Sequence, residues 1–166
     1  GKAKKFQVKI IIDLNWREVF WDYSNFSSEL SKAKRLNLIK KFLNYAHVLK
    51  LAKEEATLFF EHENPMLISQ QLSEMPDVII TDGKNPVEWF INGFQGTTET
   101  PDSQKIIDTS GAGDAFLASF VYNFNGDNFH ASLKFANEWA ACSTTLLGTL
   151  PVTKEYFKEK QKWNMA

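Results

Sequence analysis

The sequence contains one cysteine, no long apolar run and almost no net charge. Because Cys142 is the only cysteine among 166 residues, no internal disulfide can form, and a reducing compartment fits best. No apolar stretch approaches the roughly twenty residues that a membrane helix needs, and no signal-peptide pattern opens the chain. Nineteen basic against twenty acidic residues leave a net charge of −1, which gives no electrostatic reason to expect nucleic acid or a membrane as a partner. The composition predicts a protein of the cytoplasm, or of an organelle stroma after removal of a targeting segment.

Two familiar kinds of site are also missing from the sequence. There is no Gly-x-x-x-x-Gly-Lys motif of the Walker type, so phosphate binding would need another loop. The three histidines have no ligand spacing, which argues against a metal site built from protein groups alone. Cys142 lies among small residues in an expected helix, where an inert buried thiol is the natural interpretation.

What the sequence does contain is enough apolar material for a folded domain. A hydrophobic fraction of 43%, with fourteen Phe and five Trp, predicts one packed domain over 1–166. Strands are expected at 6–13, 46–49, 77–81, 87–94 and 106–107, and helices at 31–45, 53–60, 65–72, 129–146 and 154–163, with a polar loop at 96–101. A further amphipathic helix is expected to open at Asp114, with Phe116, Phe120 and Phe124 at helical spacing. This alternation predicts an α/β fold, a mostly parallel sheet flanked by helices.

The most informative segment is 105–116, which reads KIIDTSGAGDAF. Its short apolar strand is expected to end at an Asp-Thr turn, and Gly111 and Gly113 flank Ala112 just before an amphipathic helix. The small residues of such a turn let an anion approach the backbone N–H groups at a helix N-terminus. We therefore expect the N–H groups of Gly111, Ala112 and Gly113 to hold a phosphate.

Asp114 adds a carboxylate directly after these glycines. A carboxylate beside a polyphosphate is unfavourable unless it takes a proton, which is what a base does when it activates a hydroxyl for phosphoryl transfer. The alternative is a glycine-rich helix entry in which Asp114 only stabilises the first turn.

Other polar segments also follow expected strands. They are 13–17, 50–55 and 81–83, in addition to 108–114. Ligands of such sheets bind beyond the carboxyl ends of the strands, so these four segments are predicted to converge on one edge.

The segment 108–116 resembles the signature of the PfkB, or ribokinase-like, family of sugar kinases. Weaker resemblances follow in the family's order: DLNWR at 13–17 to its Asp-x-Asn-x-Arg element, LKLAKEEA at 49–56 to the Lys-x-Ser-x-Glu-Glu stretch of fructokinases, TDG at 81–83 to the nucleotide loop, and Ala136-Asn137 with GTLP at 148–151 to the adenine-side region. Members of the family are commonly about twice as long, and everything matched belongs to their C-terminal half. The resemblance implies that the N-terminal half and the lid are absent.

The resemblance also implies roles and cofactors. It implies ATP, Mg²⁺ and a small sugar as ligands, with Asp114 as general base. The resemblance implies contact with the sugar or phosphate for Asn15 and Arg17, and contact with the nucleotide for Lys50, Thr81, Gly83, Gly113 and Asn137. It implies an outer-shell contact with Mg²⁺ for Glu55. It also implies a carbonyl site for a monovalent cation such as K⁺ around Asp108, Ser110 and Gly148.

Several of these roles have plain structural alternatives. Asn15 and Arg17 could be a loop cap and a surface cation, and Lys50 could be solvated. Acids at a helix start, such as Glu55, are explained by the helix dipole alone. The segment 81–83 could be an ordinary turn. Many relatives carry Asn where Ala52 stands, and a second glycine where Pro86 stands.

The sequence leaves two functions open. One is a fructokinase-like sugar kinase of which this chain is the nucleotide and catalytic half. The other is a catalytically silent, fructokinase-like assembly protein. A fragment, a split gene product and a protein that has lost its other half are all compatible with the length. An unpaired strand edge near 6–12 predicts a homodimer or association with the missing half.

Overall fold

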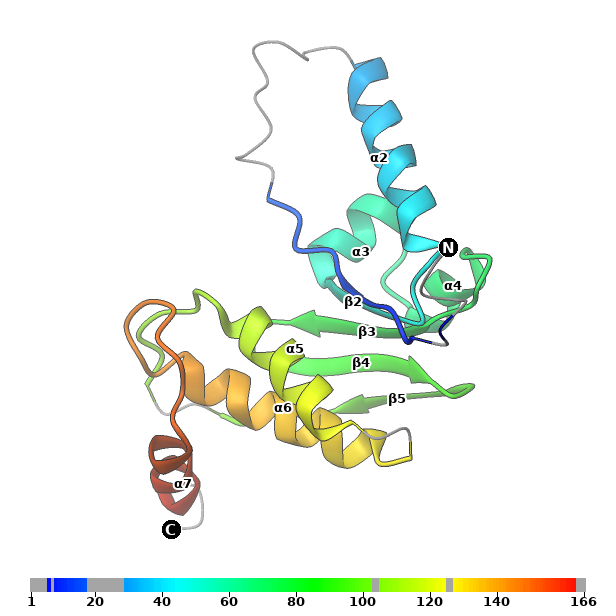
Figure 1. The fold of residues 1–166 in the computed structure, drawn as a ribbon. Coiled ribbons are helices and arrows are strands. Elements are labelled where there is room, and N and C mark those ends of the chain that lie inside the picture. The colour runs from blue at the N-terminus through cyan, green and yellow to red at the C-terminus, as the bar shows by residue number, and fades with distance from the viewer. Residues whose placement is uncertain (1–5, 7, 18–28, 103–104, 125–126, 164–166) are drawn as a thin grey trace. The chain divides into compact units, whose positions relative to one another are not determined.

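The computed structural model describes residues 6, 8–17, 29–102, 105–124 and 127–163 (Figure 1). The chain divides into two compact units. The first unit comprises residues 1–82 and 88–97, and the second comprises residues 83–87 and 98–166. Each unit has its own group of candidate residues.

A five-stranded sheet lies mainly in the first unit. Its strands follow the order β1-β2-β3-β4-β5, with bounds Ile11–Asp13, Val48–Ala52, Asp77–Asp82, Asn85–Ile91 and Phe94–Thr98. Strands β1, β2 and β3 are parallel, with Asp13 opposite Lys50 and Ala52 opposite Thr81. The turns between β3, β4 and β5 are too short for a crossover, so these strands form antiparallel hairpins. The α/β class is confirmed, and the sheet is mixed.

Two helices of the first unit, α3 (Lys53–Phe60) and α4 (Pro65–Gln70), pack on the sheet, and a third, α2 (Glu29–Leu43), joins the same core through its C-terminal end at Leu43 (Figure 1). Successive side chains of a strand point to opposite faces, so alternate residues of β2 and β3 enter one core with the helices. That core includes Leu43, Leu49, Leu51, Phe59, Ile68, Val78 and Ile80.

The starts of α3 and α4 are fixed by local chemistry. Pro65 occupies the first turn of α4, where a missing N–H costs nothing. Asn64 caps the same helix, and its Oδ1 accepts hydrogen bonds from the N–H groups of Met66 at 3.0 Å and Leu67 at 3.1 Å. In α3, the carboxylate of Glu55 reaches back to the N–H of Ala52.

The second unit is built from helices α5 (Ala112–Asn123), α6 (Phe129–Ser143) and α7 (Lys154–Trp163). Phe116 and Phe120 of α5 are buried, as the helical spacing predicts. Helix α7 contacts α6 through Phe157, whose ring stacks on Trp139 at 4.4 Å between centroids.

Among the expected strands, the first and the last differ most from the structure. The strand predicted at 6–13 covers only Ile11–Asp13, and Val8, within the predicted strand, is 54% exposed. Strand β1 pairs with β2 only over these three residues, which limits its length. The strand predicted at 106–107 is wrong, because Ile106 and Ile107 are exposed and lie in irregular backbone.

The polar loop predicted at 96–101 is wrong over residues 96–98, since β5 continues to Thr98, and residues 99–101 lie outside the strand as predicted. A Cβ on Gly96 would lie 2.6 Å from the ring of Trp89, so this glycine lets the neighbouring strand's indole cross the hairpin. Glycine therefore marks close packing here, which a sequence reading treats as a loop.

The sequence predicts the positions of the helices more accurately than their ends. The predictions for 53–60 and 154–163 are confirmed, whereas α6 ends at Ser143 instead of residue 146. The hydroxyls of Thr144 and Thr145 donate to carbonyls three residues earlier, both at 2.7 Å, in a tighter final turn. Within the described residues, no helix combines the length and apolar character needed to span a membrane.

Candidate active site

The glycine turn of the second unit depends on the absence of a side chain at Gly111. This residue is the N-cap of α5 and has a left-handed φ of 76°. A Cβ there would also lie 3.3 Å from Cγ2 of Thr149. Both the backbone conformation and the close neighbour favour glycine.

The carboxylate of Asp108 holds this turn against the segment that follows α6. One oxygen, Oδ1, accepts from the N–H of Ser110 at 2.9 Å, and Oδ2 accepts from the N–H of Gly148 at 3.0 Å. The N–H groups of Ile107 and Asp108 both donate to the carbonyl of Thr144. Hydrogen bonds from Ser110, then from Gly148, lower the pKa of Asp108 because they favour the ionised form. The structure thus joins the three residues that the resemblance groups around a cation.

The three predicted anion-binding amides are not equivalent. The N–H of Ala112 donates to the carbonyl of Thr109 at 3.2 Å, so it already has a partner inside the turn. Gly113 lies in the first turn of α5, where N–H groups have no partner within the helix. Asp114 is in the same turn with an exposed side chain. An acceptor at this helix start would meet N–H donors and the carboxylate together.

A cavity of about 860 Å³ extends from this turn within the second unit. Gly111 and Asp114 line it together with apolar and aromatic side chains, among them Trp139 and Phe157. An apolar cavity with a few polar groups at one end is typical of small-molecule sites. The sequence reading missed these aromatic residues, although Phe135 and Trp139 have the spacing of one helix face.

Asn137 has a structural use in the second unit. Its side chain is buried, at 3% exposure, and Nδ2 donates to the carbonyls of Glu99 at 3.1 Å and Thr98 at 3.4 Å. The amide therefore holds residues 98–99 against α6. Nucleotide contact by Asn137 stays a prediction.

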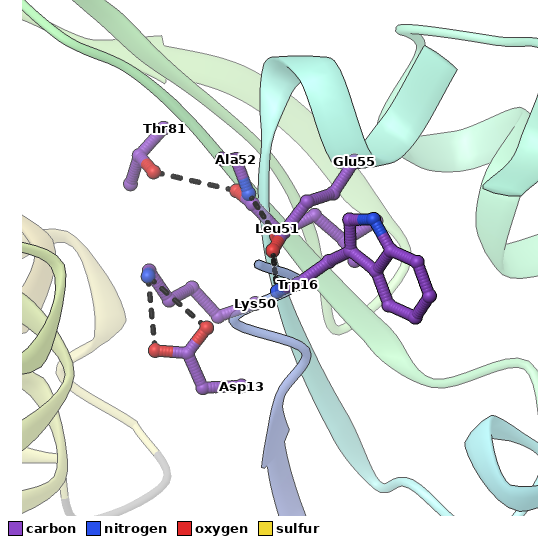
Figure 2. A network of polar contacts seen from close by, with 7 residues as sticks. All are labelled: Asp13, Trp16, Lys50, Leu51, Ala52, Glu55 and Thr81. Atoms are coloured by element: carbon purple, nitrogen blue, oxygen red, sulfur yellow. Dashed lines mark hydrogen bonds and ion pairs between the residues drawn. The ribbon is translucent and has the colours of Figure 1, made fainter. Parts of the chain in front are cut away.

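In the first unit, Lys50 is neither solvated nor free of a partner. Its Nζ lies 3.0 Å from Oδ2 and 3.1 Å from Oδ1 of Asp13, the residue opposite it in the parallel pair β1–β2 (Figure 2). The two side chains are 6% and 12% exposed. The solvated alternative for Lys50 is wrong, and its charge is largely balanced by Asp13.

Glu55 forms a second contact between the same elements. Its Oε2 accepts from the N–H of Ala52 at 2.7 Å, and its Oε1 accepts from the N–H of Trp16 (Figure 2). Burial raises the pKa of Glu55, while the N–H groups of Ala52 and Trp16 oppose that rise. The carboxylate joins the start of α3 to the segment after β1, so more than the helix dipole explains this acid.

Asn15 and Arg17, the predicted substrate residues, flank Trp16 in that segment. Both have exposed side chains. Trp16 turns inward, and its ring meets Phe59 edge-on at 5.4 Å between centroids.

The segment 81–83 forms part of a tight hairpin. Gly83, with a φ of 55°, lies in the short turn between β3 and β4. The hydroxyl of Thr81 donates to the carbonyl of Leu51 on the neighbouring strand at 3.3 Å (Figure 2). These contacts account for the segment as a turn, and its nucleotide role stays a prediction.

The remaining titratable candidates have structural surroundings. Nδ1 of His47 accepts from the N–H of Ile10 at 2.9 Å. Burial raises the pKa of Cys142, which favours the unreactive thiol. Over the parts of the chain that the structure describes, no group of three His, Cys, Asp or Glu side chains could hold a metal ion. The structure brings together two groups of predicted site residues, one in each unit. Asp13, Lys50 and Glu55 form the group in the first unit, and Asp108, Gly111, Asp114 and Gly148 form the group in the second. Convergence of both groups on one edge of the sheet stays a prediction.

The comparisons with known proteins agree on one family. The family described as pfkB family carbohydrate kinase matches residues 2–155. Fructokinase-2 of Oryza sativa subsp. japonica is 28% identical over 160 residues, which cover 90% of this chain and 45% of the relative. Ribokinase of Bacillus subtilis (strain 168) is 30% identical over 131 residues, which cover 76% of this chain and 43% of the relative. The chain spans about half the length of the curated relatives it matches.

Solved structures share the fold. A fructokinase from Xylella fastidiosa with bound ATP superposes with a TM-score of 0.76 at 23% identity, covering 98% of this chain and 56% of that one. Aminoimidazole riboside kinase from Salmonella enterica, complexed with aminoimidazole riboside and an ATP analog, gives 0.73 at 16% identity, covering 95% and 53%. At these identities the likeness shows a common fold.

Proposed function

The chain belongs to the pfkB family of carbohydrate kinases, and on that premise we propose that it forms the nucleotide and catalytic half of an ATP-dependent, fructokinase-like sugar kinase. The observation that carries the proposal is the start of α5. There a left-handed Gly111, first-turn N–H groups and the exposed Asp114 border one cavity. A helix start of this kind suits a phosphate, and the aromatic cavity beside it suits the base of a nucleotide.

The proposed reaction assigns one proton transfer to Asp114. The sugar hydroxyl oxygen forms a bond to the γ-phosphorus as its proton passes to the Asp114 carboxylate. The bond from the γ-phosphorus to the bridging oxygen breaks, and ADP leaves with that electron pair. The N–H groups of Gly111 and Gly113, with that of Ala112 if its turn bond yields, stabilise charge on the transferred group.

Metal ions fit the donor set in a limited way. Mg²⁺ keeps most of its waters when it binds through the phosphates of a nucleotide. This mode of binding needs no cluster of acidic side chains, and the described residues contain none that could hold a metal ion. Glu55 uses one acceptor position on each oxygen for main-chain N–H groups, and a carboxylate has about four such positions. Outer-shell contact with Mg²⁺ is thus compatible with its hydrogen bonds. A monovalent cation such as K⁺, held by carbonyls around Asp108, Ser110 and Gly148, would stiffen the turn.

Nucleotide binding is the direct test of this proposal. Mg-ADP or Mg-ATP should raise the midpoint of thermal unfolding, since a ligand that binds only the folded state stabilises it by mass action. The matched variant is Gly111→Ala, which should distort the anion-binding turn because its Cβ meets Thr149 and its left-handed backbone is strained. If neither nucleotide at millimolar concentration shifts the melting temperature and calorimetry is flat, the nucleotide site is absent.

The silent assembly protein is favoured by one observation, the pairing of Lys50 with Asp13. A lysine expected to balance phosphate charge is already balanced by a carboxylate. The two functions separate when an N-terminal half from a related fructokinase is supplied in trans. Phosphate transfer to a hexose supports the kinase, and a stable but inactive complex supports the assembly role.

Association with a second chain is part of either function. Strand β1 is the edge of the sheet, and Leu38 and Phe42, one turn apart on α2, are 69% and 59% exposed. Exposed apolar rows of this kind invite association. We expect a dimer by size-exclusion chromatography with light scattering, and a clean monomer would show that the chain is self-sufficient.

A further inference from the structure

Asn15 has an unusual backbone conformation at the centre of the candidate substrate segment. Its φ is 44°, in the left-handed region. Asparagine tolerates this region better than other non-glycine residues, but the conformation still costs free energy and persists where its surroundings fix it. The question is which contacts fix it.

The residues on both sides of Asn15 are held by other elements of the first unit. The N–H of Leu14 donates to the carbonyl of Lys50 at 3.3 Å. The N–H of Trp16 donates to Oε1 of Glu55 (Figure 2). The ring of Trp16 packs on Phe59. The Asn15 side chain is left exposed between the two fixed neighbours.

Glu55 is the side chain that ties this segment to α3. It is 7% exposed, and its second oxygen accepts from the N–H of Ala52. An ionised carboxylate only accepts hydrogen bonds, so it serves both N–H groups at once. A protonated carboxyl or an amide can serve one of them well, and the other then loses its acceptor.

We propose that Glu55 is a positioning residue, which fixes the left-handed backbone of Asn15 through the N–H of Trp16 and thereby aims Asn15 and Arg17 at the sugar or phosphate. The segment is prepared before the ligand arrives, so binding need not order it. This inference rests on the proposed kinase function for the identity of the ligand, but the contact itself does not depend on that function.

The positioning depends on the charge of Glu55, and two charged groups act on that charge. Lys50 stabilises the ionised form, and Asp13 opposes it. Burial opposes it more strongly than either, so Glu55 should take up a proton at a higher pH than an ordinary glutamate. Acidification should therefore release one of the two N–H groups while the rest of the first unit stays folded.

The test compares Glu55→Gln with Glu54→Gln. Glu54 is exposed in the same helical turn, so both variants remove one acidic charge from the start of α3. Amide hydrogen exchange by NMR should show the N–H of Trp16 or Ala52 exchanging about tenfold or more faster in Glu55→Gln, the scale of one hydrogen bond to a charged acceptor. Exchange at Val78, in the core, reports on global stability. Glu54→Gln should leave all three amides unchanged.

A pH titration separates positioning by charge from simple packing. In the wild type, the amide ¹⁵N shifts of Trp16 and Ala52 should follow one common titration with a midpoint above 4.5, the ordinary value of a glutamate. The titration should vanish in Glu55→Gln and persist in Glu54→Gln. Glu55→Asp keeps the charge but is one methylene shorter, so it should keep the Ala52 contact and lose the Trp16 contact. The proposal is overturned if the Trp16 amide shows no titration in the wild type and exchanges no faster in Glu55→Gln than in the wild type.

Ligand probes distinguish failure of this inference from failure of the proposed function. With metal-free ATP and fructose as probes, which leave out the Mg²⁺ contact proposed for Glu55, Arg17 signals should shift, and the affinity should fall about tenfold in Glu55→Gln because the contact groups are misplaced. Equal affinity in both glutamine variants overturns the positioning role. If no variant binds either probe but the Trp16 titration is present, the contact stands and the kinase assignment falls.

Discussion

Two carboxylates in different parts of the molecule use the same hydrogen-bonding device and respond to pH in opposite ways. Glu55 accepts from the N–H groups of Trp16 and Ala52, and Asp108 accepts from those of Ser110 and Gly148. Burial raises the pKa of Glu55, whereas the N–H groups lower the pKa of Asp108, which is close to solvent. Two carboxylates that each accept from two main-chain N–H groups therefore have pKa shifts of opposite sign, because Glu55 is buried and Asp108 is not.

The regions around the two carboxylates are also stabilised by different kinds of contact. The region around Glu55 is held by side chains, including the buried pair of Asp13 and Lys50. The region around Asp108 is held by main-chain groups and by the left-handed Gly111. The first region should therefore be sensitive to changes of charge, and the second to changes of backbone conformation.

The largest expected effect concerns Asp114, an acid of the second region. We propose that it acts as a general base, whereas Asp108 and Glu55 make structural contacts. With an N-terminal half supplied, Asp114→Asn should lower sugar phosphorylation by about 100-fold or more, the span of a positioned general base. Nucleotide affinity should hold or rise, because a negative charge beside the phosphates is removed. Steady-state kinetics and calorimetry measure the two quantities. Near-normal turnover in Asp114→Asn would show that Asp114 is not the general base. The glycine turn would then be only the start of a helix that binds anions.

In the first region, the largest stability change should come from Asp13→Ala. The substitution leaves the Lys50 charge buried without its carboxylate, which costs about 3 to 5 kcal/mol in such pairs. Chemical denaturation measures the free energy of unfolding. Adding Lys50→Met should recover much of the loss, because the buried charge is gone. As a control, Lys53→Met removes a partly exposed cation of α3 that pairs with Glu63 and Asp82, and it should cost much less than Asp13→Ala because solvent screens such pairs.

In the second region, Gly111→Ala should destabilise by about 1 to 2 kcal/mol through the left-handed backbone, with an added cost from Thr149. Gly93→Ala is the matched control. Its φ of 81° is also left-handed, but a Cβ there meets nothing within 4 Å. The difference between the two melting temperatures measures the crowding at Gly111. Equal losses would show that Thr149 moves aside without cost.

The smallest effect tests the pH contrast itself. A raised folded-state pKa means that the contribution of Glu55 to stability is complete below pH 4.5 and is lost as the pH rises through the folded value. A lowered pKa means that the contribution of Asp108 is present above pH 3.8 and is lost as the pH falls through the folded value. Free energies of unfolding from pH 3 to 7, measured for the wild type, Glu55→Gln and Asp108→Asn, should give difference curves of opposite slope. Difference curves with slopes of the same sign would show that Glu55 and Asp108 do not have pKa shifts of opposite direction.

The sequence anticipated the parts of the fold that depend on local patterns. The bounds of α3 and α7, the buried Phe116 and Phe120, and the α/β class follow from helical spacing and from alternation. It failed at Val8 and at Ile106 with Ile107, where apolar residues remain exposed, and at Gly96, where glycine lies in a strand. Those outcomes depend on neighbours that are distant in sequence.

By itself, the sequence determined the family and the glycine turn with Asp114, because small residues and a first-turn acid act on their own backbone. It also placed Lys50 and Glu55 among the candidates, but only tertiary structure decided what they contact. Lys50 lies opposite Asp13 through the register of β1 and β2, and Glu55 reaches Trp16, 39 positions away. A carboxylate's pKa is set by its burial and its partners, and both arise only when distant segments pack together.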